Sequence, residues 1–136
     1  MNRRYVLACI ATWIFVFFYE WLLHGVILEP LYLESSDLWR TQTAMTEKCH
    51  WMMLGQGIFV FLFGFIFTKG YEGRGIWEGA RYGWWIGLLL AAPNLVMYAV
   101  QPLPPLLIVG WSIGGLIEWS LAGMVLAAIY RPVRLA

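Results

Sequence analysis

The chain has 136 residues, of which 61% are hydrophobic and only 12% are charged, and its mean hydropathy is +0.67. Because a soluble domain carries roughly a quarter charged residues, this composition excludes an ordinary water-soluble fold and predicts the lipid bilayer as a partner. The net charge of +1 and the absence of a Lys/Arg run argue against a nucleic-acid partner, since phosphate binding requires a concentrated basic patch.

Four apolar runs are each long enough to cross a bilayer, for which a helix needs about 20 residues. They cover residues 5–28, 51–68, 79–100 and 106–130. Backbone groups in lipid must bond within their own segment, so each run is predicted to be a helix. The chain is therefore predicted to be an all-α integral membrane protein, a single domain of residues 1–136 with a bundle of four antiparallel transmembrane helices. The first run is too long for a signal peptide and is interpreted as a retained span.

The first span carries Glu20 and His24, which lie one turn apart on the same helix face. A carboxylate inside a span costs roughly 2.5–3.5 kcal/mol on insertion scales. We therefore expect Glu20 to face the interior of the bundle and to have a polar partner there. His24 adds a group that titrates near neutral pH.

Residues 29–50 connect the first and second spans and form the longest connection in the chain. Ser35, Ser36 and Asp37 supply a helix N-cap, and Leu38, Gln42 and Met45 then recur at helical spacing. This pattern predicts a short helix that lies in the membrane interface between the two spans.

Soft side chains gather at the end of this connection. Thioether, thiolate and imidazole ligands together suit Cu(I), although no standard metal spacing is present. The candidate ligands are Met45, Cys49, His50, Met52 and Met53. A haem between His24 and His50 is a second alternative. Our main expectation is that the chain holds no cofactor.

The third and fourth spans carry small residues at intervals of four, which allow helix backbones to approach closely. The expected packing positions are Gly79, Gly83, Gly87, Gly110 and Gly114. Because the last two share a helix face with Glu118, we expect this second carboxyl to face inward as well.

A polar cluster is expected in the outer half of the bilayer. From the rise of about 1.5 Å per residue, Glu20 and Glu118 reach similar depths, as do Gln56, Asn94 and Tyr98. Two interpretations stay open. The cluster is either a polar cavity with protonatable carboxyls beside a histidine, or a set of hydrogen bonds that only holds the helices together.

The basic residues predict the orientation. Seven of them fall on the side of the N-terminus and two, Arg40 and Lys48, fall on the other side, which places both termini in the cytoplasm. Residues 69–83, together with Glu20, His24 and Gly25, resemble a group of small bacterial four-helix inner-membrane proteins of unassigned function. The resemblance implies a bacterial inner-membrane location and supplies no catalytic residues.

The sequence favours a small transporter or channel that moves a proton, a cation or a small solute through the Glu/His cluster. Replacing a buried polar cluster by apolar residues is often neutral or stabilising, so a site explains these residues better than stability does. The alternative is a structural or accessory subunit that packs in a homo-oligomer or with partner membrane subunits. No nucleophile–base pair or phosphate loop stands out, so an enzyme is less favoured.

Overall fold

The computed structural model describes residues 3–130, and all regular structure in this range is helical. The long helices are α1 (Arg3–Leu22), α4 (Cys49–Lys69), α5 (Ile76–Val100) and α6 (Pro105–Ile129). Helix α1 continues as a π-helical segment, η1 (Leu23–Ile27), which is followed by α2 (Glu29–Glu34), a 3₁₀ turn η2 (Ser36–Leu38) and α3 (Gln42–Glu47).

Four helices, with α1 and η1 taken together, are long and apolar enough to cross a membrane. The prediction of an all-helical chain with four such helices is confirmed, and the predicted boundaries agree within three residues with those of the structure. Insertion into a membrane and the orientation of the termini stay predictions.

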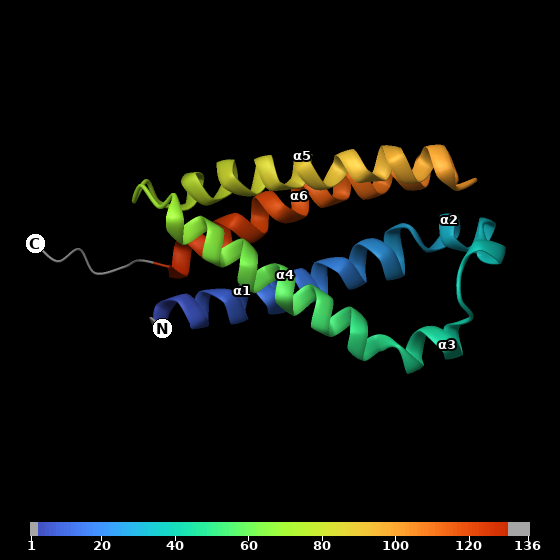
Figure 1. Cartoon of the computed structure of the whole chain (residues 1–136), viewed down its shortest axis with the longest axis horizontal. Coiled ribbons are helices and arrows are strands. Elements are labelled where there is room, and N and C mark those ends of the chain that lie inside the picture. The colour runs from blue at the N-terminus through green and yellow to red at the C-terminus, as the bar shows by residue number, and fades with distance from the viewer. Residues whose placement is uncertain (1–2, 131–136) are drawn as a thin grey trace, which may run out of the picture.

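Successive long helices run in opposite directions along the long axis of the molecule (Figure 1). Helix α6 packs most extensively on α5 and also contacts α1, whereas α4 packs on α1. Helix α4 meets α5 near the loop that joins them, where the rings of Phe63 and Phe67 pack against Tyr82. From there the two helices diverge toward α3 (Figure 1), so α4 leaves one side of α5 uncovered.

Glycines bring α5 and α6 into backbone contact. A Cβ atom built on Gly79 would lie 1.9 Å from the carbonyl oxygen of Gly123, and one on Gly83 would lie 1.8 Å from that of Trp119. No side chain fits at such distances, so these two positions of α5 require glycine. The predicted small-residue stripe of the third span therefore lies in the α5–α6 contact.

The stripe of the fourth span has a different neighbour. Gly110 and Gly114 face the side chains of Leu28 and Leu23, so this side of α6 receives the end of the first span. Nearby, Tyr19 on α1 donates a hydrogen bond to the carbonyl oxygen of Gly114 at 3.0 Å. In this way a tyrosine hydroxyl ties two helices together at a backbone acceptor.

The connection between the first two spans differs from its prediction. A single interfacial helix beginning near Ser36 was expected, but the segment forms two six-residue helices, α2 and α3, separated by η2. Pro30 in the first turn of α2 favours helix initiation there. The cap of α3 is Thr41, whose hydroxyl accepts from the Ala44 N–H at 3.4 Å, so this helix begins later than predicted.

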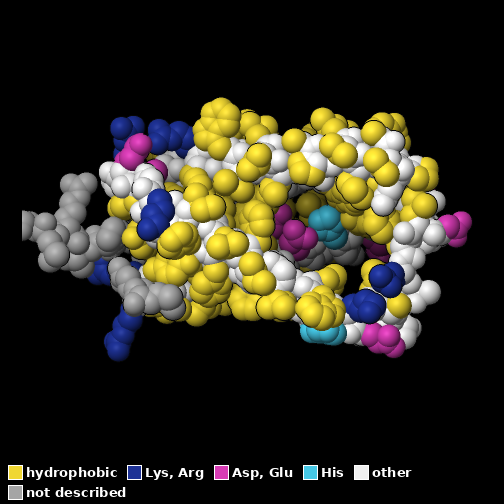
Figure 2. Space-filling view, in the orientation of Figure 1, with side chains coloured by type: hydrophobic (Ala, Val, Ile, Leu, Met, Phe, Trp, Pro, Cys, Tyr) yellow, Lys and Arg dark blue, Asp and Glu magenta, His cyan; other side chains and the backbone are white. Residues whose placement is uncertain are grey.

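Large apolar side chains cover most of the visible face of the molecule (Figure 2). Lys and Arg side chains lie toward its two ends, and a hollow between the helices shows Glu and His side chains in an otherwise apolar region (Figure 2). The outward-facing residues of the long helices include Leu7, Phe18, Ile58, Leu89 and Val109. This distribution is typical of a surface whose middle contacts lipid and whose ends contact water.

Candidate functional site

A cavity of about 280 Å³ lies between α1, α5 and α6, toward the α2 end of the molecule. Each helix contributes side chains spaced three or four apart, which therefore lie on a single face. They are Glu20, Leu23 and His24 from the first span, Gly87, Leu90, Ala91 and Asn94 from α5, and Trp111, Gly115, Glu118 and Trp119 from α6. No residue of α4 lines the cavity, and Figure 2 shows the Glu and His side chains through its open side.

Glu118 is the most unusual member of this site. Its exposed fraction is 2%, and within residues 3–130 its Oε1 atom has no hydrogen-bond partner. Burying a charged group without partners is very costly, so such a carboxyl either holds a proton or waits for a cation. The Oε1 atom of Glu118 is thus a buried acceptor that is available to a proton or a cation.

Glu20 lies beside this group and is less enclosed. Its side chain is 40% exposed, it lines the same cavity, and it is close enough to Glu118 for the two carboxyls to interact. Two neighbouring carboxyls in an apolar site do not both ionise readily, because like charges repel at short range. The pair is therefore suited to share one proton or to hold one cation between them.

A chain of hydrogen-bonding groups leads away from Glu20. Its Oε2 atom lies 3.3 Å from His24 Nε2, and His24 Nδ1 lies 2.5 Å from the hydroxyl of Tyr32 on α2. The same hydroxyl accepts a hydrogen bond from Trp111 Nε1 at 2.6 Å. Four side chains from η1, α2, α6 and α1 thus form one connected row.

The protons in this row can be assigned from donor and acceptor chemistry. The indole of Trp111 can only donate, so the Tyr32 oxygen accepts from it and the Tyr32 O–H is free to donate to His24 Nδ1. A neutral His24 then carries its proton on Nε2, where it faces the Glu20 carboxylate. To become a cation, His24 must place a proton on Nδ1, which requires the Tyr32 hydroxyl to turn away.

Tyr32 keeps its own proton at physiological pH. Burial, opposed by the Trp111 hydrogen bond and reinforced by the charge of Glu20, raises the pKa of the Tyr32 hydroxyl to about 12. The hydroxyl therefore acts as a neutral donor and acceptor that can reverse its direction. It does not act as an anion.

The π-helical segment η1 explains how His24 reaches Tyr32. A π-turn is wider than an α-turn and inserts extra backbone into the helix, and such turns are frequent at functional sites. Gly25 lies within this segment, and Leu28, which ends it, hydrogen-bonds back to Leu23 at 2.9 Å. The wider turn carries the chain into α2, which positions Tyr32 over the imidazole.

Aromatic rings close the end of the site nearest α2. The Tyr32 ring lies 5.3 Å from that of Trp39 and 6.4 Å from that of Trp111, and the two Trp rings are 6.1 Å apart. Leu103 and Leu107 are buried beneath them. Because this end is packed, the open side of the cavity lies laterally, where α4 and α5 diverge.

The structure brings together some of the predicted site residues and separates others. Glu20, His24, Asn94 and Glu118 line one cavity, and Asn94 also donates to the Ser112 hydroxyl at 3.3 Å. The other two predicted pathway residues lie elsewhere. Gln56 on α4 accepts a hydrogen bond from Trp13 at 2.9 Å, and Tyr98 is exposed near the end of α5.

The cofactor alternatives receive no support from the geometry. In the described part of the chain, no three His, Cys, Asp or Glu side chains converge as a metal site would require. The candidate copper ligands Met45, Met52, Met53 and Cys49 are exposed, and the His50 ring packs beside Trp51. For haem, both ring nitrogens of His24 already face Glu20 and Tyr32, which leaves none for iron.

Tyr32 and Trp111 are functional candidates that sequence reasoning missed as site residues. Trp111 is one of nine Trp residues in the chain, and Tyr32 lies in the connection, where nothing in its spacing relates it to His24. Searches against protein-family models, curated proteins and solved structures found nothing that matches this chain, so the site is interpreted from its own geometry.

Proposed function

We propose that this protein is a small integral membrane protein that binds and moves a proton or a small cation through the Glu20–Glu118 carboxyl pair. The observation that carries the proposal is the Glu118 carboxyl, which is buried with one oxygen unpartnered and which lines a cavity beside a second carboxyl. A purely structural carboxyl would have both oxygens bonded, since an unsatisfied buried polar atom costs about 1–3 kcal/mol.

A membrane location is supported by two features of the chain. Four helices have the length and hydropathy of spans, and their outward faces carry large apolar side chains. In the predicted topology seven basic residues fall on the side of the N-terminus and two on the other, which favours cytoplasmic termini. Two of the seven, Arg131 and Arg134, lie outside the described residues. With this orientation, the rise per residue along the spans puts the carboxyl pair in the outer half of the bilayer.

The hydrogen-bonded row provides a route for protons to reach the carboxyl pair. A proton that arrives at His24 Nδ1 turns the Tyr32 hydroxyl, and the imidazole then passes its Nε2 proton to Glu20. Each such passage leaves the His24 proton on Nδ1 instead of Nε2, so the imidazole must return to its first tautomer, and the Tyr32 hydroxyl must turn back, before the next one. The row thus transfers protons singly, at the pace of the tautomer exchange and the hydroxyl rotation.

A cation would use the same carboxyls in competition with the proton. Binding between Glu20 and Glu118 would supply the missing partner of Glu118 Oε1 and would displace the shared proton. The lateral opening between α4 and α5 gives access that does not pass through the aromatic rings. Binding is therefore expected to weaken as the pH falls.

Proteoliposomes test this function. Purified protein is reconstituted with a trapped pH-sensitive dye, and proton movement is driven by a potassium diffusion potential at several pH values. The parent should show pH-dependent proton uptake, and Glu20→Gln and Glu118→Gln should each reduce it at least about tenfold, because an amide cannot carry the proton. The matched control is Glu47→Gln, which changes an exposed carboxyl at the end of α3 and should behave as the parent.

The alternative is an accessory subunit of a membrane complex, and one observation favours it. Glu20 and His24 are 40% and 34% exposed through a lateral opening, where a polar side chain of a partner helix would also fit. If the parent moves neither protons nor cations, or if both Gln variants behave as the parent does, the transport proposal is wrong. Co-purification of a membrane partner that is lost in Glu20→Gln would then support the accessory role.

A further inference from the structure

A second cavity, of about 450 Å³, lies between α4 and α5 at their loop end, away from the carboxyl pair. We define it as the basic groove, whose lining combines two cations and one carboxylate with apolar and aromatic side chains: Lys69, Arg81, Glu78, Ile66, Phe67, Gly70, Tyr82 and Trp85. Lys69 comes from the last turn of α4 and Arg81 from the second turn of α5, so the two cations approach the groove from facing helices. No part of the proposed transport function uses these residues.

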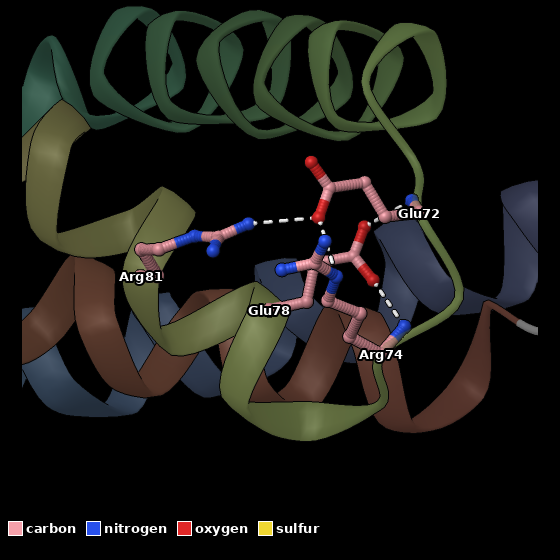
Figure 3. Close-up of polar contacts among 4 residues, drawn as sticks. All are labelled: Glu72, Arg74, Glu78 and Arg81. Atoms are coloured by element: carbon pink, nitrogen blue, oxygen red, sulfur yellow. Dashed lines mark hydrogen bonds and ion pairs between the residues drawn. The ribbon is translucent and has the colours of Figure 1, made fainter.

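The charged groups at the groove leave an excess of one cation, because Lys69, Arg74 and Arg81 are balanced only by Glu72 and Glu78. Glu78 is 5% exposed, and its two carboxylate oxygens accept the backbone N–H groups of Glu72 at 2.6 Å and Arg74 at 2.7 Å (Figure 3). It lies in the first turn of α5, where the helix dipole also stabilises a negative charge. These bonds hold the Glu78 carboxylate against the loop backbone, and among the described residues it forms no ion pair with Lys69 or Arg81.

Glu72 is shared between two arginines. Its Oε2 atom lies 2.9 Å from Arg74 Nε and 3.0 Å from Arg81 Nη2 (Figure 3). The contact holds the Arg81 side chain in position and uses one of its five N–H donors. Lys69 has no acidic partner in residues 3–130, and its ammonium lies 4.7 Å from the centre of the Phe65 ring.

The walls of the groove indicate which kind of anion would bind. Beside the two cations, Ile66 and Trp85 are exposed, and they continue into the apolar outer faces of α4 and α5. A soluble phosphate ion would use the cations and leave this apolar surface uncovered. A phospholipid uses both, because its phosphate meets the cations while its acyl chains lie along the apolar wall.

From this arrangement we infer that the basic groove binds the headgroup of an anionic phospholipid in the leaflet nearest the α4–α5 loop. The phosphate lies between the Lys69 ammonium and the free N–H groups of Arg81, and the Trp85 ring lies beside the glycerol region, where Trp is favoured. A bound lipid would also fill the space between α4 and α5 at the end where these two helices meet.

Native mass spectrometry of the purified protein in a neutral detergent tests this inference. The probes are dioleoylphosphatidylglycerol and dioleoylphosphatidylcholine, which share acyl chains and differ in headgroup charge. The parent should retain phosphatidylglycerol in preference to phosphatidylcholine. Lys69→Gln and Arg81→Gln should each lower this preference about fivefold, the effect expected for one cation near a phosphate.

Matched controls separate the groove from general effects. Lys48→Gln removes an exposed lysine between α3 and α4, at the opposite end of α4 from the groove, and Arg74→Gln removes a partner of Glu72 that does not line the groove. Both should retain the parent's preference, as should Glu118→Gln, so the result does not depend on the transport proposal. Lys69 has no ion pair to lose, so its variant is expected to fold, which circular dichroism verifies.

Three outcomes would overturn the inference. The preference for phosphatidylglycerol could survive in Lys69→Gln and Arg81→Gln. Arg74→Gln could lower it as much as Arg81→Gln does, which would attribute the effect to the loop. Millimolar inorganic phosphate could displace the bound lipid in full, which would identify a site for soluble anions.

Discussion

At Gly83, in the half of the α5–α6 pair nearest the α4–α5 loop, an added Cβ atom would lie 1.8 Å from the Trp119 carbonyl oxygen. At Gly115, in the other half, no atom lies within 4 Å of an added Cβ. The same two helices are therefore in backbone contact around Gly79 and Gly83, which we call the loop half, and leave space beside Gly115. We call the residues that line the cavity there, Glu118 among them, the cavity half.

The two halves also differ in the hydrogen bonding of the buried carboxyl that each contains. In the loop half, Glu78 is 5% exposed and both of its oxygens accept backbone N–H groups. In the cavity half, Glu118 is 2% exposed and its Oε1 atom has no partner in the described residues. Burial alone therefore does not identify a site. An incomplete set of hydrogen bonds at a cavity does.

The largest effect is expected when the same substitution is made in both halves. Gly83→Ala should destabilise the fold by about 3 kcal/mol, because the new methyl group meets backbone and α5 must move away from α6. Gly115→Ala should leave stability unchanged or raise it by up to about 1 kcal/mol, since Ala is the better helix former and space is available. Thermal unfolding in detergent measures both, and equal losses would contradict the comparison.

A second pair of variants compares the two carboxyls. Glu78→Ala should cost about 2 kcal/mol, because two backbone N–H groups lose charged acceptors. Glu118→Met keeps a similar volume and should change stability by less than about 1 kcal/mol in either direction while abolishing proton uptake. If Glu118→Met proves the more destabilising of the two, the carboxyl in the cavity is a structural group after all.

Much of the fold could be predicted because membrane solvation imposes simple rules. Four spans follow from length and hydropathy alone, and the stripe of Gly79, Gly83 and Gly87 indicated a close helix contact, which the structure shows to be with α6. The spacing of Glu20 and His24 also sufficed to place them on one face. These are local or one-dimensional properties, which a sequence displays directly.

The rest of the site depends on the rotation of each helix and on the path of the connection, which residue spacing in the sequence does not reveal. The depth estimate for Gln56 gives a height in the bilayer and not a direction, and the rotation of α4 turns this residue toward Trp13. Tyr32 reaches His24 only because the π-helical turn redirects the chain. For Glu78, a signal was present, since a Glu three residues after a helix cap commonly reaches back to backbone N–H groups.

The smallest expected loss of stability is that of Tyr32→Phe. The Tyr32 hydroxyl links His24, which lines the cavity, to Trp111, one of the aromatic rings that close its end. Its pKa is about 12 in the fold and about 10 in an unfolded chain. Between these values the folded protein keeps a proton that the unfolded chain releases, so ionisation of Tyr32 lowers stability as the pH rises from about 10 to about 12. Tyr32→Phe should lack this part of the alkaline loss.

The same variant also tests the hydrogen-bonded row near neutral pH. Without the hydroxyl, His24 Nδ1 and the Trp111 N–H lose their shared partner, which should cost about 1 kcal/mol in the free energy of unfolding. Proton uptake should become slower and less dependent on pH, since no hydroxyl then holds His24 in the tautomer whose Nε2 proton faces Glu20. The matched control is Tyr98→Phe, which removes an exposed hydroxyl that has no hydrogen bond in residues 3–130. If Tyr32→Phe and Tyr98→Phe give the same pH profile, protons reach Glu20 directly through the lateral opening.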